Sequence, residues 1–252
     1  MQFTDIAKHV IFRKSDVIDK FRTDAAFRHF IQKTIKDNLI RRIRRDMYAV
    51  VDPTTGDIYA SKYLIASSIS QNAYLVYHSA IEYHGLANQV YHVLTVAEDA
   101  KFNNFEHDGI EYQFVKSPIN GFIEKINHGA ILKVTSKERT IIDCIANMKM
   151  SGGISEILGA LDLLHFLDET KLMECLKAYA VKGLYKKVGY LLKYYQDQLS
   201  LSDNFFTFCM GNMSKSIEYL LKESVSKSIL QIEWALMAPS YADLQKLVGG
   251  GF

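Results

Sequence analysis

Four arginines stand close together in residues 38–50, and their side chains suit the binding of nucleic acid. They are Arg41, Arg42, Arg44 and Arg45. A guanidinium group binds a phosphate or a guanine edge through two parallel hydrogen bonds, whereas a lysine ammonium acts as a point charge. Apolar residues lie before, between and after these arginines, as in a strand pair with one buried face. Asp46 lies where the chain must reverse between the two strands. The segment predicts a basic β-hairpin that faces DNA. The alternative is a solvated basic strand pair on an ordinary domain.

The positive charge of the chain is concentrated at its N-terminal end. Residues 1–51 hold 12 Lys and Arg against 6 Asp and Glu, which is a net charge of +6. The remaining residues hold 18 Lys and Arg against 22 Asp and Glu, which is a net charge of −4. Arg139 is the single arginine after residue 45. This asymmetry predicts a small N-terminal part, the head (residues 1–51), that binds nucleic acid. The remaining residues, the body, would by themselves repel DNA.

Apolar spacing in front of the hairpin predicts three helices, over residues 3–11, 17–21 and 25–37, with Thr23 or Asp24 capping the third. Three helices followed by a basic hairpin are typical of a winged helix-turn-helix, whose third helix enters the major groove. We therefore expect base readout by Thr23, Ala25, Arg28 and Gln32. We expect contacts to phosphates or the minor groove from Lys33, Lys36, Arg41, Arg42, Arg44 and Arg45.

The rest of the chain predicts a body of segregated helices and strands. Turn residues at 52–56 indicate a linker, so we expect a winged helix-turn-helix domain at 1–52 and a second domain at 57–252. Helices are predicted at 57–70 and 74–86, a small β-sheet within 89–134, and a helical part at 135–248. The sheet's strands are predicted at 89–97 and 110–115, with one or two more within 121–134. This order favours an α+β fold over a doubly wound sheet.

Composition excludes several other classes of protein. The chain is 48% hydrophobic, which is enough for a substantial core, and no apolar run approaches the roughly 18 residues of a membrane span. The first residues have no signal-peptide pattern. The three cysteines are far apart in apolar contexts and are typical of buried thiols in a reducing compartment. We therefore expect a cytoplasmic protein without a membrane partner.

Three further groups of polar residues have types that could form a site. His78, Glu82 and His84 cannot converge on one ion from a single helix, so packing or capping roles are preferred to metal binding. Asp99 and Lys101 follow a predicted strand in the manner of a nuclease core motif, but without an obvious second acid. Arg139 and Asp143 fit an i,i+4 surface salt bridge. We expect no catalytic residue, no metal ligand, no cofactor and no enzymatic activity.

Several segments of the body resemble the AbiEi-type antitoxins of abortive-infection toxin–antitoxin pairs. The sharpest match is Ser-Ala-Ile-Glu-Tyr-His-Gly-Leu at residues 79–86, and the ordered set covers roughly the first four-fifths of the chain. The hairpin that ends in Tyr48 is similar to the wing of that family, except that Asp46 stands where the family usually has glycine. The other matching segments are residues 63–67, 74–78, 93–96, 110–114, 134–143 and 187–192.

The resemblance implies a winged-helix antitoxin that acts in phage defence. Such proteins repress their own operon by binding inverted repeats in double-stranded DNA. They also counteract a cognate nucleotidyltransferase-like toxin, as a rule without a stable complex. A monomer, or a dimer induced on DNA, is compatible with this role. The acid of Asp46 beside the arginines is expected to weaken phosphate contacts more than it disturbs the hairpin.

Three hypotheses follow from the sequence. The first is a DNA-binding antitoxin and transcriptional autorepressor without catalysis of its own. The second is a metal-dependent nuclease, resting on Asp99 and Lys101, whose winged head delivers DNA. The third is a protein-interaction module that neutralises a toxin through the acidic body.

Overall fold

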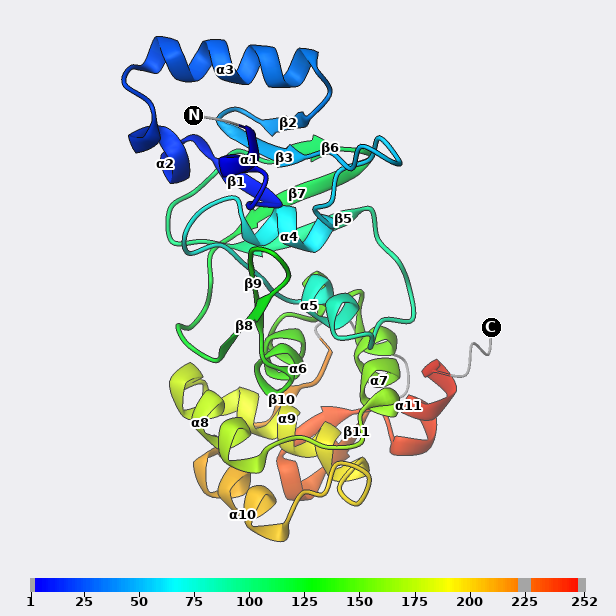
Figure 1. Cartoon of the computed structure of the whole chain (residues 1–252). Coiled ribbons are helices and arrows are strands. Elements are labelled where there is room, and N and C mark those ends of the chain that lie inside the picture. The colour runs from blue at the N-terminus through cyan, green and yellow to red at the C-terminus, as the bar shows by residue number, and fades with distance from the viewer. Residues whose placement is uncertain (1–2, 222–227, 249–252) are drawn as a thin grey trace. The chain divides into compact units, whose positions relative to one another are not determined.

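The computed structural model describes residues 3–221 and 228–248, and it has an α+β fold (Figure 1). The chain divides into two compact units. Unit 1 comprises Met1–Leu75, Tyr91–Ser117 and Ile123–Val134, and unit 2 comprises Val76–Val90, Pro118–Phe122 and Thr135–Phe252. This grouping differs from the division predicted at residues 52–57, because the N-terminal 51 residues share a unit with strands of the expected body.

The N-terminal part of unit 1 packs short helices against a small antiparallel sheet. The sheet has the strand order β1-β3-β2. Its core contains Phe12, Phe27 and Tyr48, and the Tyr48 ring contacts the other two. The elements are α1 (Phe3–Ile6), β1 (Ile11–Arg13), α2 (Lys14–Val17), the 3-10 helix η1 (Ile18–Lys20), α3 (Asp24–Lys36), β2 (Ile40–Arg44) and β3 (Met47–Val50).

Of the four predicted elements in this part, helix α3 and the hairpin are confirmed, and the helix over residues 3–11 is wrong. The helix predicted over residues 17–21 is replaced by α2, which ends at Val17, and by the 3-10 helix η1. Helix α3 begins after Thr23, and the hairpin reverses at Asp46, whose φ of 60° is left-handed. The helix predicted over residues 3–11 ends at Ile6, and Ile11 instead pairs with Ala49 of β3. The apolar spacing is misleading because Ile11 and Phe12 are buried as strand residues rather than on a helix face.

The remainder of unit 1 is a six-stranded mixed sheet with the strand order β6-β7-β5-β4-β9-β8. Strand β5 pairs parallel to β7 and antiparallel to β4, and β6 pairs antiparallel to β7. The short helix α4 (Lys62–Ser67) precedes the sheet in the chain. The strands are β4 (Tyr74–Leu75), β5 (Val93–Ala97), β6 (Phe105–His107), β7 (Ile110–Val115), β8 (Ile123–Asn127) and β9 (Ile131–Thr135).

Backbone pairing between extended segments makes two helices shorter than predicted. The helix predicted over residues 57–70 is confined to α4, because Ile58 forms a β-bridge with Val51. The helix predicted over residues 74–86 begins only at His78, because the two residues of β4 pair with β5. Strand β6 is not predicted by the sequence at all, and β5 begins at Val93 rather than at residue 89.

Unit 2 is mainly helical but also contains a small sheet, so the helical part predicted over residues 135–248 needs correction. Strands β10 (Glu218–Tyr219), β11 (Ile229–Gln231) and β12 (Leu236–Ala238) form a sheet with the order β10-β12-β11. The 3-10 helices are η2 (Met148–Ser151) and η3 (Ile232–Trp234). The helices are α5 (His78–Tyr83), α6 (Lys137–Ala146), α7 (Ile154–Leu163), α8 (Glu169–Tyr179), α9 (Lys182–Tyr194), α10 (Asp203–Asn212) and α11 (Tyr241–Val248).

The ion pair between Arg139 and Asp143 is predicted on the surface but lies in the core of unit 2. Both side chains are fully buried, and Arg139 Nε donates to Asp143 Oδ2 at 3.2 Å. The Tyr179 hydroxyl donates to the other carboxylate oxygen, and Arg139 Nη1 donates to the Gly121 carbonyl. Helix α6 is covered on both faces, which the i,i+4 spacing alone does not reveal.

Helix α9 makes close contact with the indole of Trp234, and this contact requires glycine at position 189. A Cβ atom added to Gly189 would lie 2.2 Å from the Trp234 ring. We expect Gly189→Ala to lower the free energy of unfolding by about 1–3 kcal/mol, because overpacking displaces buried atoms. The matched control is Gly211→Ala in α10, where a Cβ meets no atom within 4 Å and a gain of about 0.5–1 kcal/mol is expected. Urea unfolding measures both changes, and equal changes would contradict the packing explanation.

Candidate nucleic-acid interface

A groove of about 400 Å³ lies between helix α3 and the β2–β3 hairpin, both in unit 1. Four cationic side chains line it, against the single carboxylate of Asp46. The lining residues are Lys14, Phe27, Arg28, Ile31, Gln32, Ile35, Arg42, Arg45, Asp46 and Tyr48. The groove therefore combines a positive rim with an apolar floor, which suits a polyanion that also carries flat apolar groups.

Helix α3 supplies Arg28 and Gln32 to the groove, and these are two of the four residues predicted to read bases. Phe27 and Ile31 of the same helix are buried in the core of unit 1, and this fixes which face of α3 looks outward. The Arg28 side chain is 74% exposed, and its Nη2 lies 3.9 Å from Asp24 Oδ2. At that distance and exposure the pair holds the guanidinium only weakly, so Arg28 stays available to a ligand.

Lys14 also lines the groove, although it is not among the residues predicted from the sequence. Its Nζ donates to Asp24 Oδ2 at 2.8 Å, and this hydrogen bond lowers the pKa of the Asp24 carboxyl below its usual range. Lys14 directly follows strand β1, whose apolar spacing indicates helix, so no sequence signal places it beside α3. Its ammonium group completes the positive rim at the N-terminal end of α3.

The other residues predicted on α3 do not line the groove. Ala25, Lys33 and Lys36 are exposed on the helix surface outside it. Thr23 is the N-cap, and its hydroxyl oxygen accepts a hydrogen bond from the Ala26 N–H at 3.1 Å. The hydroxyl of Thr23 is thus engaged in holding the first turn of the helix.

Loss of this cap is expected to lower the free energy of unfolding of the N-terminal part of unit 1. Thr23→Ala removes the acceptor for the Ala26 N–H, and such caps contribute about 1 kcal/mol to stability. Thr23→Ser keeps the acceptor and serves as the control. We expect urea unfolding to show a loss of about 1 kcal/mol for alanine and little change for serine. Equal losses for the two variants would show that the methyl group, not the cap, matters.

The four hairpin arginines separate into two pairs. Arg42 and Arg45 line the groove, and the Arg45 side chain is 88% exposed. Arg45 Nε lies 3.6 Å from Asp46 Oδ2. The carboxylate of Asp46 therefore lies close to one of the hairpin arginines, as the sequence predicts. Arg41 and Arg44 do not line the groove and instead contact other parts of unit 1. The structure therefore brings together Arg28, Gln32, Arg42 and Arg45 of the predicted site.

The other polar groups named from the sequence make separate contacts. His78 Nε2 lies 3.2 Å from Glu156 Oε1 inside unit 2, whereas His84 Nε2 bonds to the Thr135 carbonyl at 2.7 Å. Asp99 and Lys101 are exposed beyond the end of β5. Within residues 3–221 and 228–248, no three His, Cys, Asp or Glu side chains gather closely enough to hold a metal ion.

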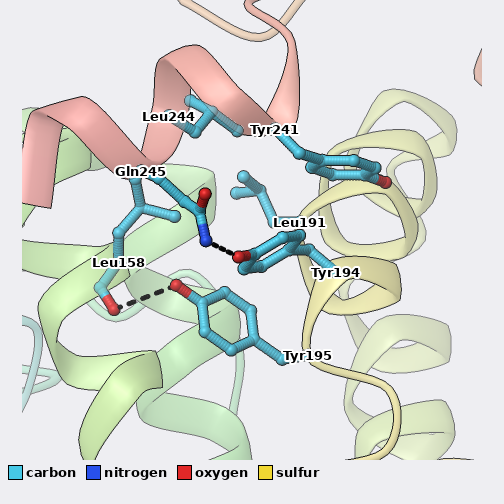
Figure 2. Close-up of a pocket in the computed structure, with 7 residues that line it drawn as sticks. All are labelled: Leu158, Leu191, Tyr194, Tyr195, Tyr241, Leu244 and Gln245. Atoms are coloured by element: carbon cyan, nitrogen blue, oxygen red, sulfur yellow. Dashed lines mark hydrogen bonds between the residues drawn. The ribbon is translucent and has the colours of Figure 1, made fainter.

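A second hollow, in unit 2, is too small for a ligand (Figure 2). Its volume is about 10 Å³, which is the space of roughly one water molecule. The Tyr195 hydroxyl donates to the Leu158 carbonyl at 3.4 Å, and Gln245 Nε2 bonds to the Tyr194 hydroxyl. The lining residues are Leu158, Leu191, Tyr194, Tyr195, Tyr241, Leu244 and Gln245.

Comparison with known proteins adds a fold but no function. No protein-family model matches the sequence, and no curated protein matches it. A solved structure does match: the crystal structure of RV2827C protein from Mycobacterium tuberculosis. The TM-score is 0.66 at 14% sequence identity, over 98% of this chain and 92% of that one. The two chains share a fold. At this identity the likeness shows nothing beyond the fold.

None of the helices in the described residues has the length and hydrophobicity needed to cross a membrane.

Proposed function

We propose that the chain is a DNA-binding antitoxin that represses its own operon. The observation that carries the DNA-binding part is the groove between α3 and the hairpin, with Lys14, Arg28, Arg42 and Arg45 on its rim. Each of these side chains can contact a phosphate, and the arginines can also bind guanine edges. The protein acts without catalysis of its own.

The arrangement of the head supports a winged helix-turn-helix. Helix α3 follows two shorter helices and precedes a hairpin, and the first strand pairs with the last to give the order β1-β3-β2. In this proposal α3 lies in the major groove, where Arg28 and Gln32 meet base edges. The β2–β3 hairpin is the wing, and Arg42 and Arg45 contact the backbone or the minor groove.

The antitoxin part of the proposal rests on the resemblance of the body to AbiEi-type antitoxins. Four of the matching segments lie wholly within regular elements: residues 63–67 in α4, 93–96 in β5, 110–114 in β7 and 187–192 in α9. The partners proposed are double-stranded DNA with inverted repeats and a nucleotidyltransferase-like toxin that forms no stable complex. The proposed location is the cytoplasm.

The experiment is a mobility-shift assay on the double-stranded DNA upstream of the protein's own gene. Wild type is expected to retard this DNA, and Arg42→Ala/Arg45→Ala to retard it only at much higher protein concentration. The control is Lys182→Ala/Lys187→Ala, which removes two lysines from α9 in unit 2. Equal binding by the groove variant and wild type, or no binding by either, would refute DNA recognition by the head. Rescue of growth on co-expression with the product of the adjacent gene tests the antitoxin role separately.

A further inference from the structure

Strand β2 contains one residue more than its partner β3 over the same stretch. Arg42 pairs with Tyr48, and the next pair is Arg44 with Met47, so Ile43 is the extra residue of a β-bulge. Side chains alternate between the two faces of a strand, and one inserted residue reverses the faces that follow it. The bulge therefore moves Arg44 away from the face of Arg42 and onto the face of Arg41.

The side chain of Arg44 packs on two aromatic rings of unit 1, one in β6 and one in the segment that precedes β6. Its guanidinium carbon lies 4.8 Å from the centre of the Phe105 ring and 5.8 Å from that of Phe102. Phe105 in turn stacks on Tyr112, with ring centres 4.7 Å apart and ring planes 9° apart. Strands β2 and β6 are in contact, so this stack joins the hairpin to the β6–β7 pair.

The guanidinium of Arg44 is held by these rings rather than by a carboxylate. Its Nη1 atom is buried and has no hydrogen-bond partner in the part of the chain that the structure describes. Burial lowers the pKa of Arg44, which is the expected effect of removing a cation from water. Because the aromatic faces attract the cation, the stack offsets part of this desolvation.

Arg41 is fixed on the same face by polar contacts. Its Nη2 donates to the Gly56 carbonyl at 2.8 Å, in the turn that follows β3. Its Nη1 lies 3.9 Å from Asp108 Oδ2, in the turn between β6 and β7. The hydrogen bond to Gly56 therefore ties Arg41 to the turn after β3, and the solvent-exposed pair with Asp108 at 3.9 Å adds only a weak contact.

We infer that Arg41 and Arg44 are positioning residues, which hold the basic hairpin on the β6–β7 pair, and that they do not contact the nucleic acid. The effects on DNA binding that this inference predicts rest on the proposed function. It divides the arginine cluster by role: Arg42 and Arg45 bind, whereas Arg41 and Arg44 fix the angle at which the hairpin presents them. A neutral residue, Phe105, thereby becomes necessary for tight binding of a polyanion.

The test compares three single variants by the salt dependence of DNA binding. Each phosphate contact contributes about 0.9 to the slope of log K against log salt concentration. Arg45→Met is expected to reduce the magnitude of that slope by about 0.9. Arg44→Met and Phe105→Ala are expected to weaken binding several-fold while leaving the slope at its wild-type value. A slope reduced by Arg44→Met as much as by Arg45→Met would overturn the inference, as would unchanged affinity for Phe105→Ala.

Thermal unfolding without DNA tests the anchor independently of the proposed function. We expect Arg44→Met and Phe105→Ala each to lower the Tm by a few degrees, and the double variant to lower it by little more than the larger single change. That coupling is the signature of a direct contact. Fully additive shifts would overturn the inference. Failure of the wild type to bind any DNA would refute the proposed function, while the unfolding cycle would still decide whether the anchor exists.

Discussion

Arg139→Met is expected to lower the free energy of unfolding by about 3–5 kcal/mol, because it leaves a buried carboxylate without its cation. Arg139 and Asp143 are both fully buried, so solvent cannot replace the lost partner. The Gly121 carbonyl also loses the donor that Arg139 Nη1 provides. Tyr179 still donates to Asp143, but a neutral hydroxyl does not compensate the charge. Urea unfolding followed by circular dichroism measures the change.

Two controls separate the ion pair from general loss of packing. Arg139→Met/Asp143→Leu removes both charges, so it is expected to be more stable than Arg139→Met alone. Arg28→Met replaces an arginine whose side chain is 74% exposed, and a change within about 0.5 kcal/mol is expected. If Arg139→Met proved as harmless as Arg28→Met, the buried ion pair would not stabilise unit 2.

Arg28→Ala is expected to reduce the preference for upstream DNA over scrambled DNA by about 5- to 150-fold, because a bidentate contact to a base contributes about 1–3 kcal/mol of discrimination. Arg28 is suited to this contact because it lines the groove from α3 while keeping its guanidinium in solvent. Fluorescence anisotropy with the two duplexes at one salt concentration measures the preference.

Lys33→Ala is the matched control for Arg28→Ala. Lys33 is an exposed cation on the same helix, but it lies outside the groove lining. Its loss is expected to weaken binding to both duplexes by a similar factor, or to change neither. A loss of preference on Lys33→Ala, with none on Arg28→Ala, would mean that a different face of α3 reads the bases.

Local chemistry explains which parts of the head could be predicted from the sequence. Helix α3 is indicated by its Thr23 cap and by the buried spacing of Phe27 and Ile31. The hairpin is indicated by its apolar alternation and by an aspartate at a left-handed position. Both signals lie within a few residues of the element they specify, so no distant contact is needed to interpret them.

Distant contacts explain what could not be predicted. Strand β1 owes its conformation to pairing with β3, more than thirty residues away in the sequence, so its apolar spacing indicates a helix that does not form. The burial of Arg139 depends on elements that cover both faces of α6. The sequence does not distinguish the four hairpin arginines from one another, because no residue type indicates the single-residue bulge at Ile43. The register of pairing between β2 and β3, rather than the residue types of the hairpin, decides which arginines line the groove.

The most direct test of the account is the salt dependence of binding to upstream double-stranded DNA. It compares wild type with Arg28→Ala/Arg42→Ala/Arg45→Ala. For wild type, log K is expected to fall linearly with log salt concentration. For the variant, the magnitude of the slope is expected to be smaller by about 1.8, since the two phosphate contacts of Arg42 and Arg45, at about 0.9 each, are lost. A wild-type slope near zero, or identical slopes for the two proteins, would contradict the claim that this groove binds DNA.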